Sequence, residues 1–258
     1  MAGGAILLLV GFTYREAAQP PPPAPVPVAI AVASLVRNRA FVALNLAMMA
    51  MIVAVTILNK SVLYFFKYQL GDESAGQLAL ASMMLVSGLA VPVWMLLRRW
   101  TGERTLWFVA SAIGMVGLAT FAATDVERSA TMQIFLIAMQ VAIVGLNFVF
   151  WAMLPNTIEF GERSTGLRIE GVVFGAAALL QRIAIGVATA IFGWTLGSAG
   201  YVANAEQSEG ALAAMRWTIA LIPLGFLTLS CLLMLLNPLG KGEHARILEE
   251  LRRRRTGA

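Results

Sequence analysis

The stretch WAMLPNTIEFGERSTGLRIEG, at residues 151–171, decides the fold of this chain. It leads into a long apolar segment that holds Gln181 and Arg182 and ends in GWTLGSAGY at 193–201. A charged turn therefore joins two apolar segments of membrane-spanning length, and the second segment contains an arginine. An ionised side chain at the centre of a bilayer costs at least about 2.5–3.5 kcal/mol, so such an arginine is expected to have a function. The pattern predicts a bundle of membrane helices around this turn.

The composition of the whole chain indicates a bilayer as its surroundings. Of the 258 residues, 59% are hydrophobic and 13% are charged, whereas a soluble domain has about 25% charged residues. The net charge of +5 is best explained by membrane topology, and no nucleic-acid partner is expected. The single Cys231 and the single His244 argue against a disulfide or a metal centre. Phosphate-binding glycine loops and catalytic triads are absent, so we predict that the chain is not an enzyme.

Six apolar segments are long enough to cross a membrane. They lie at 41–66, 76–97, 106–124, 132–154, 170–198 and 212–236. Helices satisfy all their backbone hydrogen bonds internally, as a span in lipid requires. We therefore predict an all-α integral membrane protein with a six-transmembrane-helix bundle at 41–236.

Three further segments flank this bundle. Residues 1–14 are apolar but too short to span, so they are expected to form part of a transmembrane helix. Residues 15–40 contain clustered prolines and are expected to be an extended linker. Residues 237–258 form a basic tail, in which Ile247, Leu248 and Leu251 predict an amphipathic helix on the membrane surface.

The placement of basic residues predicts the orientation of the chain. Most of the 19 Lys and Arg lie in the linker, in the second-to-third and fourth-to-fifth connections, or in the tail. Loops rich in Lys and Arg stay in the cytoplasm. The linker and the tail are therefore expected on the cytoplasmic side of the plasma (inner) membrane, which an even number of spans also requires.

Arg182 is the first candidate for function. It lies 12 residues from one end of segment 170–198 and 16 from the other, near the membrane midplane. We expect it to line a solute pathway; the alternative is a buried ion pair without a transport role. Gln181 is adjacent and points about 100° away on a helix. Asn147 is the best placed of the other intramembrane polar residues, about eight residues before the charged turn.

The charged residues after Asn156 are expected in a loop. Glu159, Glu162 and Glu170 lie near Arg163 and Arg168 there, so local salt bridges are expected. No metal-ligand spacing is formed by these carboxylates.

The order of the motifs in this region resembles a known family. The residues concerned are Glu159, Gly161 and Glu162, then Gly166, Arg168, Glu170 and Gly171, then Gln181 and Arg182. The pattern resembles that of the glycoside–pentoside–hexuronide:cation symporters, the melibiose-permease branch of the major facilitator superfamily. By this resemblance the six segments correspond to the seventh through twelfth helices, the C-terminal half of a twelve-helix transporter. Arg182 then takes the place of a membrane-embedded lysine.

The resemblance implies secondary active transport of a sugar or glycoside, by symport with Na⁺ or H⁺ and without a tightly bound cofactor. In the family, the carboxylates that bind the cation lie in the N-terminal six helices. A partner is therefore implied, either an N-terminal half or a second copy of this chain. The alternative is a non-transporting membrane subunit or an inactive truncated fragment.

Overall fold

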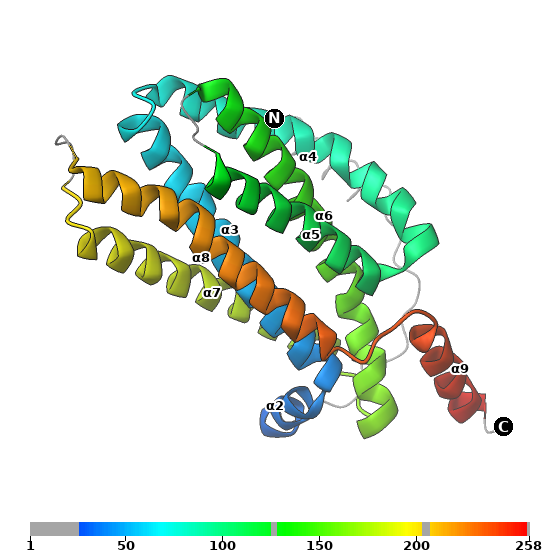
Figure 1. Cartoon of the computed structure of the whole chain (residues 1–258). Helices are drawn as coiled ribbons and strands as arrows, with labels where there is room; N and C mark the ends of the chain where they lie inside the picture. The colour runs from blue at the N-terminus through cyan, green and yellow to red at the C-terminus, as the bar shows by residue number, and fades with distance from the viewer. Residues whose placement is uncertain (1–25, 125–127, 203–206, 257–258) are drawn as a thin grey trace, which may run out of the picture.

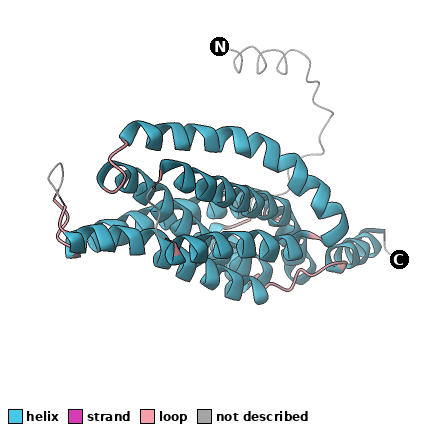
Figure 2. Cartoon of the chain, turned by 45° about the horizontal axis from the view of Figure 1, so that its top comes forward, coloured by secondary structure: helices cyan, strands magenta, loops and turns pink. Residues whose placement is uncertain are grey.

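The computed structural model describes residues 26–124, 128–202 and 207–256. These ranges form helices and contain no strand (Figure 2). The helices are α2 (Val28–Arg37), α3 (Arg39–Tyr68), α4 (Glu73–Thr101), α5 (Glu103–Ala123), α6 (Ser129–Thr165), α7 (Glu170–Ser198), α8 (Glu209–Leu235) and α9 (Glu243–Thr256). The partial helix expected at 1–14 lies outside the described residues.

Six of these helices, α3 to α8, are long and apolar enough to cross a membrane. The predicted all-α bundle is thereby confirmed. The helices exceed the expected segments at several ends, because helical geometry continues past the apolar core into the polar boundary. The largest extension is in α6, which runs to Thr165.

Helix α3 forms the core of the bundle. It contacts α8, α7, α6 and α4 (Figure 1). In the central apolar part of α3, 67% of the residues are buried, against 18% in α4 and 22% in α7. Polar groups fix α3 against α8: the Ser230 hydroxyl donates to the Ala47 carbonyl at 2.8 Å, and the Asn237 amide donates to the Ala40 carbonyl at 3.3 Å. Helices α4 and α7 therefore form the flanks of the bundle.

The contact between α4 and α6 is held by polar side chains in an apolar setting. Trp94 Nε1 donates to the Val141 carbonyl at 3.0 Å, and the Gln140 amide donates to the Ser87 hydroxyl at 2.6 Å. Interhelical hydrogen bonds of this kind hold membrane helices together where the hydrophobic effect is weak. Gly145 makes the approach possible, because its missing side chain leaves room for the Trp94 ring.

The expected linker is helical in its last part. Pro27 precedes α2, and its carbonyl accepts hydrogen bonds from the amides of Ile30 at 3.0 Å and Ala31 at 3.1 Å. The prolines end at this position, and the apolar sequence 28–37 that follows has no helix breaker. The prediction of an extended backbone was therefore wrong for residues 28–37, which form α2. Helices α2 and α9 lie at the same end of the bundle (Figure 1), which we call the basic end because it includes Arg37, Arg98, Arg163 and the tail.

The tail contains the predicted amphipathic helix, α9, but its apolar stripe faces protein. Ile247 is 0% exposed and Leu251 is 7% exposed, and α9 contacts the C-terminal part of α6. The extra turns of α6 beyond the apolar segment provide the surface that buries these side chains. The prediction that this stripe rests on the membrane surface was wrong.

Candidate functional site

Helix α6 continues through most of the expected charged turn. Pro155 lies inside the helix, and the residues after it, Asn156, Thr157 and Ile158, are buried. A proline inside a helix removes one hydrogen bond, and packing of its flanks can offset that loss. Glu159 and Glu162 therefore lie on a helix and not in a loop. Gly166 ends α6 with a left-handed φ of 70°, which suits a residue without a side chain.

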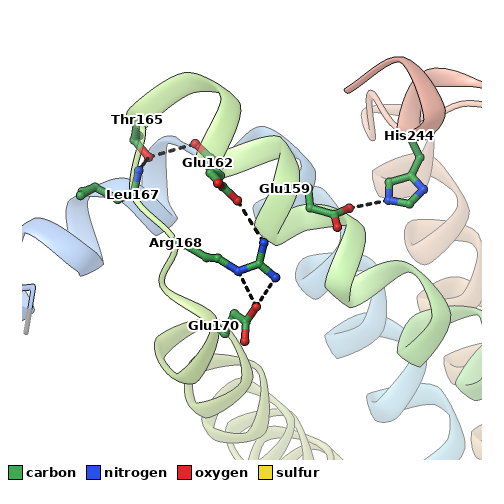
Figure 3. Close-up of polar contacts among 8 residues, drawn as sticks. Glu159, Glu162, Thr165, Leu167, Arg168, Glu170 and His244 are labelled. Carbon is green, nitrogen blue, oxygen red and sulfur yellow. Dashed lines mark hydrogen bonds and ion pairs between the residues drawn. The ribbon is translucent and has the colours of Figure 1, made fainter. Parts of the chain in front are cut away.

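Arg168 joins the end of α6 to the start of α7 (Figure 3). Its Nη1 lies 3.2 Å from Glu162 Oε2, and its Nε donates to Glu170 Oε1 at 2.7 Å. The hydrogen bond that Arg168 donates to the Glu170 carboxylate is the main cause that raises the pKa of Arg168, and the charge of Glu162 adds to it. The expected local salt bridges are thus confirmed for Glu162 and Glu170. They bridge the last turn of α6 and the first residue of α7.

Gly161 allows α6 to approach the start of α3 closely. Asn38, which is buried, accepts a hydrogen bond from the Phe41 amide at 3.0 Å and donates to the Thr157 carbonyl at 2.7 Å. A Cβ at position 161 would lie 2.8 Å from Asn38 Nδ2. Gly161 therefore has a packing role, whereas Gly171 on α7 faces open space within this chain.

Gly161→Ala is expected to destabilise the bundle by about 1–3 kcal/mol, because the new methyl group displaces a buried amide that caps α3. Gly171→Ala is the matched control, in the same motif and without a neighbour within 4 Å. It should be neutral or stabilise α7 by up to about 1 kcal/mol. Thermal unfolding in detergent measures both variants. Equal melting temperatures for the two would contradict the role of Gly161.

A second polar contact at the basic end joins α6 to the tail. His244 of α9 pairs with the Glu159 carboxylate (Figure 3). Arg163 lies nearby, with its Nη1 3.7 Å from Glu250 Oε2, and its carbonyl accepts from Arg254 Nη1 at 2.9 Å. In sequence His244 has no clustered partner, and 85 residues separate it from Glu159. Only the docking of α9 brings them together.

The intramembrane candidates lie on different faces. Arg182 is on the exposed face of α7, and within the described ranges it has no hydrogen bond or ion pair. The opposite face of α7, with Ala184 and Ala188, is buried against α3. Gln181 is half-buried, and its side-chain nitrogen lacks a hydrogen-bond partner within the described residues.

Asn147 is half-buried on α6 and donates to the Ile143 carbonyl of its own helix at 3.1 Å. No hydrogen bond or ion pair joins Asn147 to Arg182 or Gln181 in the described part of the chain. One chain therefore supplies these candidate groups on separate helices, with Arg182 directed away from the core.

Comparison with known proteins identifies the family. The family described as MFS/sugar transport protein matches residues 1–241. The chain belongs to this family. The match confirms the predicted resemblance to the sugar symporters of the major facilitator superfamily, and it agrees with the six-helix membrane architecture. Members of this MFS family are transporters and not enzymes.

Several relatives are similar over much of the chain. The Glucuronide carrier protein homolog of Escherichia coli (strain K12) is 25% identical over 86% of this chain and 49% of its own length. The Isoprimeverose transporter of Lactiplantibacillus pentosus is 28% identical over 70% of this chain and 38% of its own length. The Putative sulfoquinovose importer of Salmonella typhimurium (strain LT2) is 32% identical over 55% of this chain and 32% of its own length. The chain thus spans about half the length of the relatives that it matches most fully.

Proposed function

We propose that this chain is the C-terminal half of a secondary transporter that moves a sugar or glycoside, by symport with Na⁺ or H⁺. The observation that carries the proposal is the family match over residues 1–241 in a chain half as long as its relatives. The names of those relatives describe carriers of a glucuronide, of sulfoquinovose and of isoprimeverose, which supports a sugar derivative as the solute. The cation and its carboxylate ligands belong to the other half in this proposal.

The exposed apolar side chains on the flanks of the bundle support the proposal that a second bundle packs against them. Helix α4 exposes large apolar side chains, among them Met84 at 77% and Leu89 at 77%, and α7 exposes Leu179 at 61% and Trp194 at 76%. In a two-bundle transporter the solute site lies at the midplane between the bundles. We propose that the other bundle, an N-terminal half or a second copy, covers α4 and α7. Arg182, Gln181 and Asn147 then line the solute path.

The charges of the basic end support a proposed orientation of the chain in the membrane. Arg98, Arg163 and the arginines of α9 gather there, and the positive-inside rule supports a cytoplasmic location for this end. The salt bridges of Arg168 with Glu162 and Glu170 would then brace the cytoplasmic connection of α6 to α7.

Uptake of labelled sugar by membrane vesicles tests the proposal. Vesicles contain this chain with and without the segment that supplies the first six helices, and a Na⁺ or pH gradient is applied. We expect gradient-dependent uptake when both halves are present, and uptake by this chain alone would identify a second copy as the partner. A non-transporting subunit or an inactive fragment would instead give no uptake in any combination, and no change of thermal stability with solute.

A further inference from the structure

The contact between α4 and α6 contains two hydrogen-bonded pairs of the same kind. Gln133 of α6 pairs with Ser82, and the Gln140 amide donates to the Ser87 hydroxyl at 2.6 Å. The two glutamines are seven residues apart, close to two helical turns, so they lie on the same face of α6. Asn147 follows on this face after another seven residues, and all three amide side chains are half-buried.

Ser87 fixes the orientation of the Gln140 amide. The Ser87 hydroxyl donates its proton to the Met83 carbonyl at 2.9 Å, so it can only accept a hydrogen bond from Gln140. The amide therefore directs its NH2 group to Ser87 and its oxygen, Oε1, away from Ser87. Within the described ranges, Gln140 Oε1 accepts no hydrogen bond and is not enclosed by protein. The contact between the helices thus uses the amide nitrogen and leaves the oxygen as an available acceptor.

The Gln140–Ser87 pair lies near the membrane midplane. Gln140 is about 4.5 Å along the helix axis from the centre of the apolar segment 132–154, and Ser87 lies at the centre of segment 76–97. Transporters built from two bundles bind their solute at this depth, between the bundles. Gln133 lies next to the end of segment 132–154, about 15 Å from its centre. The two pairs therefore share their chemistry but differ in depth.

Gln140 does not face the apolar groove between α5 and α6. That groove is lined on α6 by Thr131, Ile134, Phe135 and Ala138. At about 100° per residue, Gln140 lies about 180° around the helix from Thr131 and about 160° from Ala138. The amide instead lies on the α4 side, where the other bundle packs in the proposed transporter. An acceptor without a donor is costly in hydrocarbon, so Gln140 Oε1 is expected to meet a polar group there.

We propose that Gln140 Oε1 accepts a hydrogen bond from a hydroxyl group of the transported sugar, and that Ser87 is the positioning residue for this amide. The inference rests on the proposed transport function and adds these two residues to its solute path. Asn147 offers a second acceptor about 10.5 Å further along the same face. Its amide nitrogen donates to the Ile143 carbonyl, and its oxygen accepts no hydrogen bond in the described part of the chain.

Gln140→Met is expected to weaken solute binding, because methionine cannot accept the hydrogen bond of a sugar hydroxyl as an amide does. Uptake of labelled methyl glucoside, methyl xyloside and methyl glucuronide is measured in vesicles that hold both halves of the transporter. For a glycoside that is taken up, KM should rise about three- to tenfold with little change in kcat, since one neutral hydrogen bond is lost from the ground state and the transition state alike.

Gln133→Met is the matched control. It removes the same kind of bond between α6 and α4, that of Gln133 with Ser82, but about 15 Å from the midplane. Both variants should lower the melting temperature in detergent by similar amounts, whereas only Gln140→Met should raise KM. A role in helix packing alone would change the two variants in the same way.

Ser87→Ala releases the Gln140 amide and should raise KM about two- to threefold. Ser87→Thr keeps the hydroxyl and should retain the KM of the unmodified protein. Single deoxy analogues of the transported glycoside, each without one hydroxyl, test the contact with Gln140 directly. One analogue should raise KM in the unmodified protein but cause no further rise in Gln140→Met, because both changes remove the same hydrogen bond.

Thiol labelling tests whether this face of α6 meets water, and it does not depend on the choice of sugar. Gln140→Cys and Ala138→Cys are compared on a background in which Cys231 is replaced by serine. The two positions differ by about 3 Å in depth, but Ala138 lines the apolar groove with α5. A charged thiosulfonate reagent needs a thiolate in water, so it should label Gln140→Cys at least about tenfold faster.

The outcomes separate the two claims. Equal KM values in Gln140→Met and Gln133→Met, raised or unchanged, overturn the sugar contact and leave the transport proposal intact. Equal labelling of Gln140→Cys and Ala138→Cys also overturns it, and this readout decides should Gln140→Met fail to insert. No uptake of any of the three glycosides overturns the proposed function, and the inference with it.

Discussion

Gly145→Ala is expected to loosen the contact between α4 and α6 and to lower the stability of the bundle by about 1–3 kcal/mol or more. A Cβ at this position would lie 2.5 Å from Cε2 and 2.7 Å from Cζ2 of Trp94. The Trp94 ring cannot move aside easily, because it is 2% exposed and its Nε1 donates to the Val141 carbonyl. Thermal unfolding in detergent measures the loss.

Gly225→Ala on α8 is the matched control, because a Cβ there meets no atom within 4 Å. It should leave the melting temperature unchanged or raise it slightly, since alanine favours helix over glycine by about 1 kcal/mol. The double variant Gly145→Ala with Trp94→Leu should recover part of the stability, because the smaller side chain makes room. A Gly145→Ala protein as stable as Gly225→Ala would show that α4 and α6 do not pack this closely.

The spanning helices could be predicted because their signal is local. About 20 consecutive apolar residues are needed to cross a bilayer, and each of the six segments meets that length without reference to any other. The ends of α6 could not be placed in this way. Pro155 and the charges after it are local signs of a turn, but the helix runs on to Thr165, and its last turns contact the start of α3 and α9.

The positions of some candidate-site residues likewise follow from local sequence, whereas others depend on contacts between distant segments. The depth of Arg182 follows from counting residues along one helix, and its exposed face is consistent with the predicted solute pathway. The pairing of Glu159 with His244 required knowledge of which helices meet, and no spacing in the sequence encodes it. The close approach of Asn38 to Gly161 is of the same kind, because 119 residues separate Asn38 from its acceptor Thr157.

The basic end therefore depends on contacts between segments far apart in the chain. Asn38 joins α3 to α6, Arg168 joins α6 to α7, and His244 joins α6 to α9. Lys241 Nζ adds a link from the tail to the Trp100 carbonyl at 3.2 Å. Helix α6 takes part in three of these four links, so movements of the tail and of the α6–α7 connection are expected to be coupled through it.

Ile247→Asp is expected to detach α9 from α6. The substitution removes a fully buried aliphatic side chain, which contributes about 1.5–3 kcal/mol, and it places a carboxylate in the apolar contact. Trypsin should then cut at the arginines of α9 at least about tenfold faster, because cleavage follows the population of the detached helix. The rate is measured on purified protein in detergent.

Ala245→Asp is the matched control, since it adds the same charge at an exposed position two residues away on the same helix. Its trypsin cleavage should stay close to that of the unmodified protein, because the charge remains in water. A short cross-linker between Glu159→Cys and His244→Cys, on a background in which Cys231 is replaced by serine, gives an independent readout. It should link the two positions in the otherwise unmodified chain and fail in Ile247→Asp. If both aspartate variants were cut at the same rate and the cross-link persisted, α9 would be held by its charges alone, and the buried stripe of Ile247 and Leu251 would not contribute to docking.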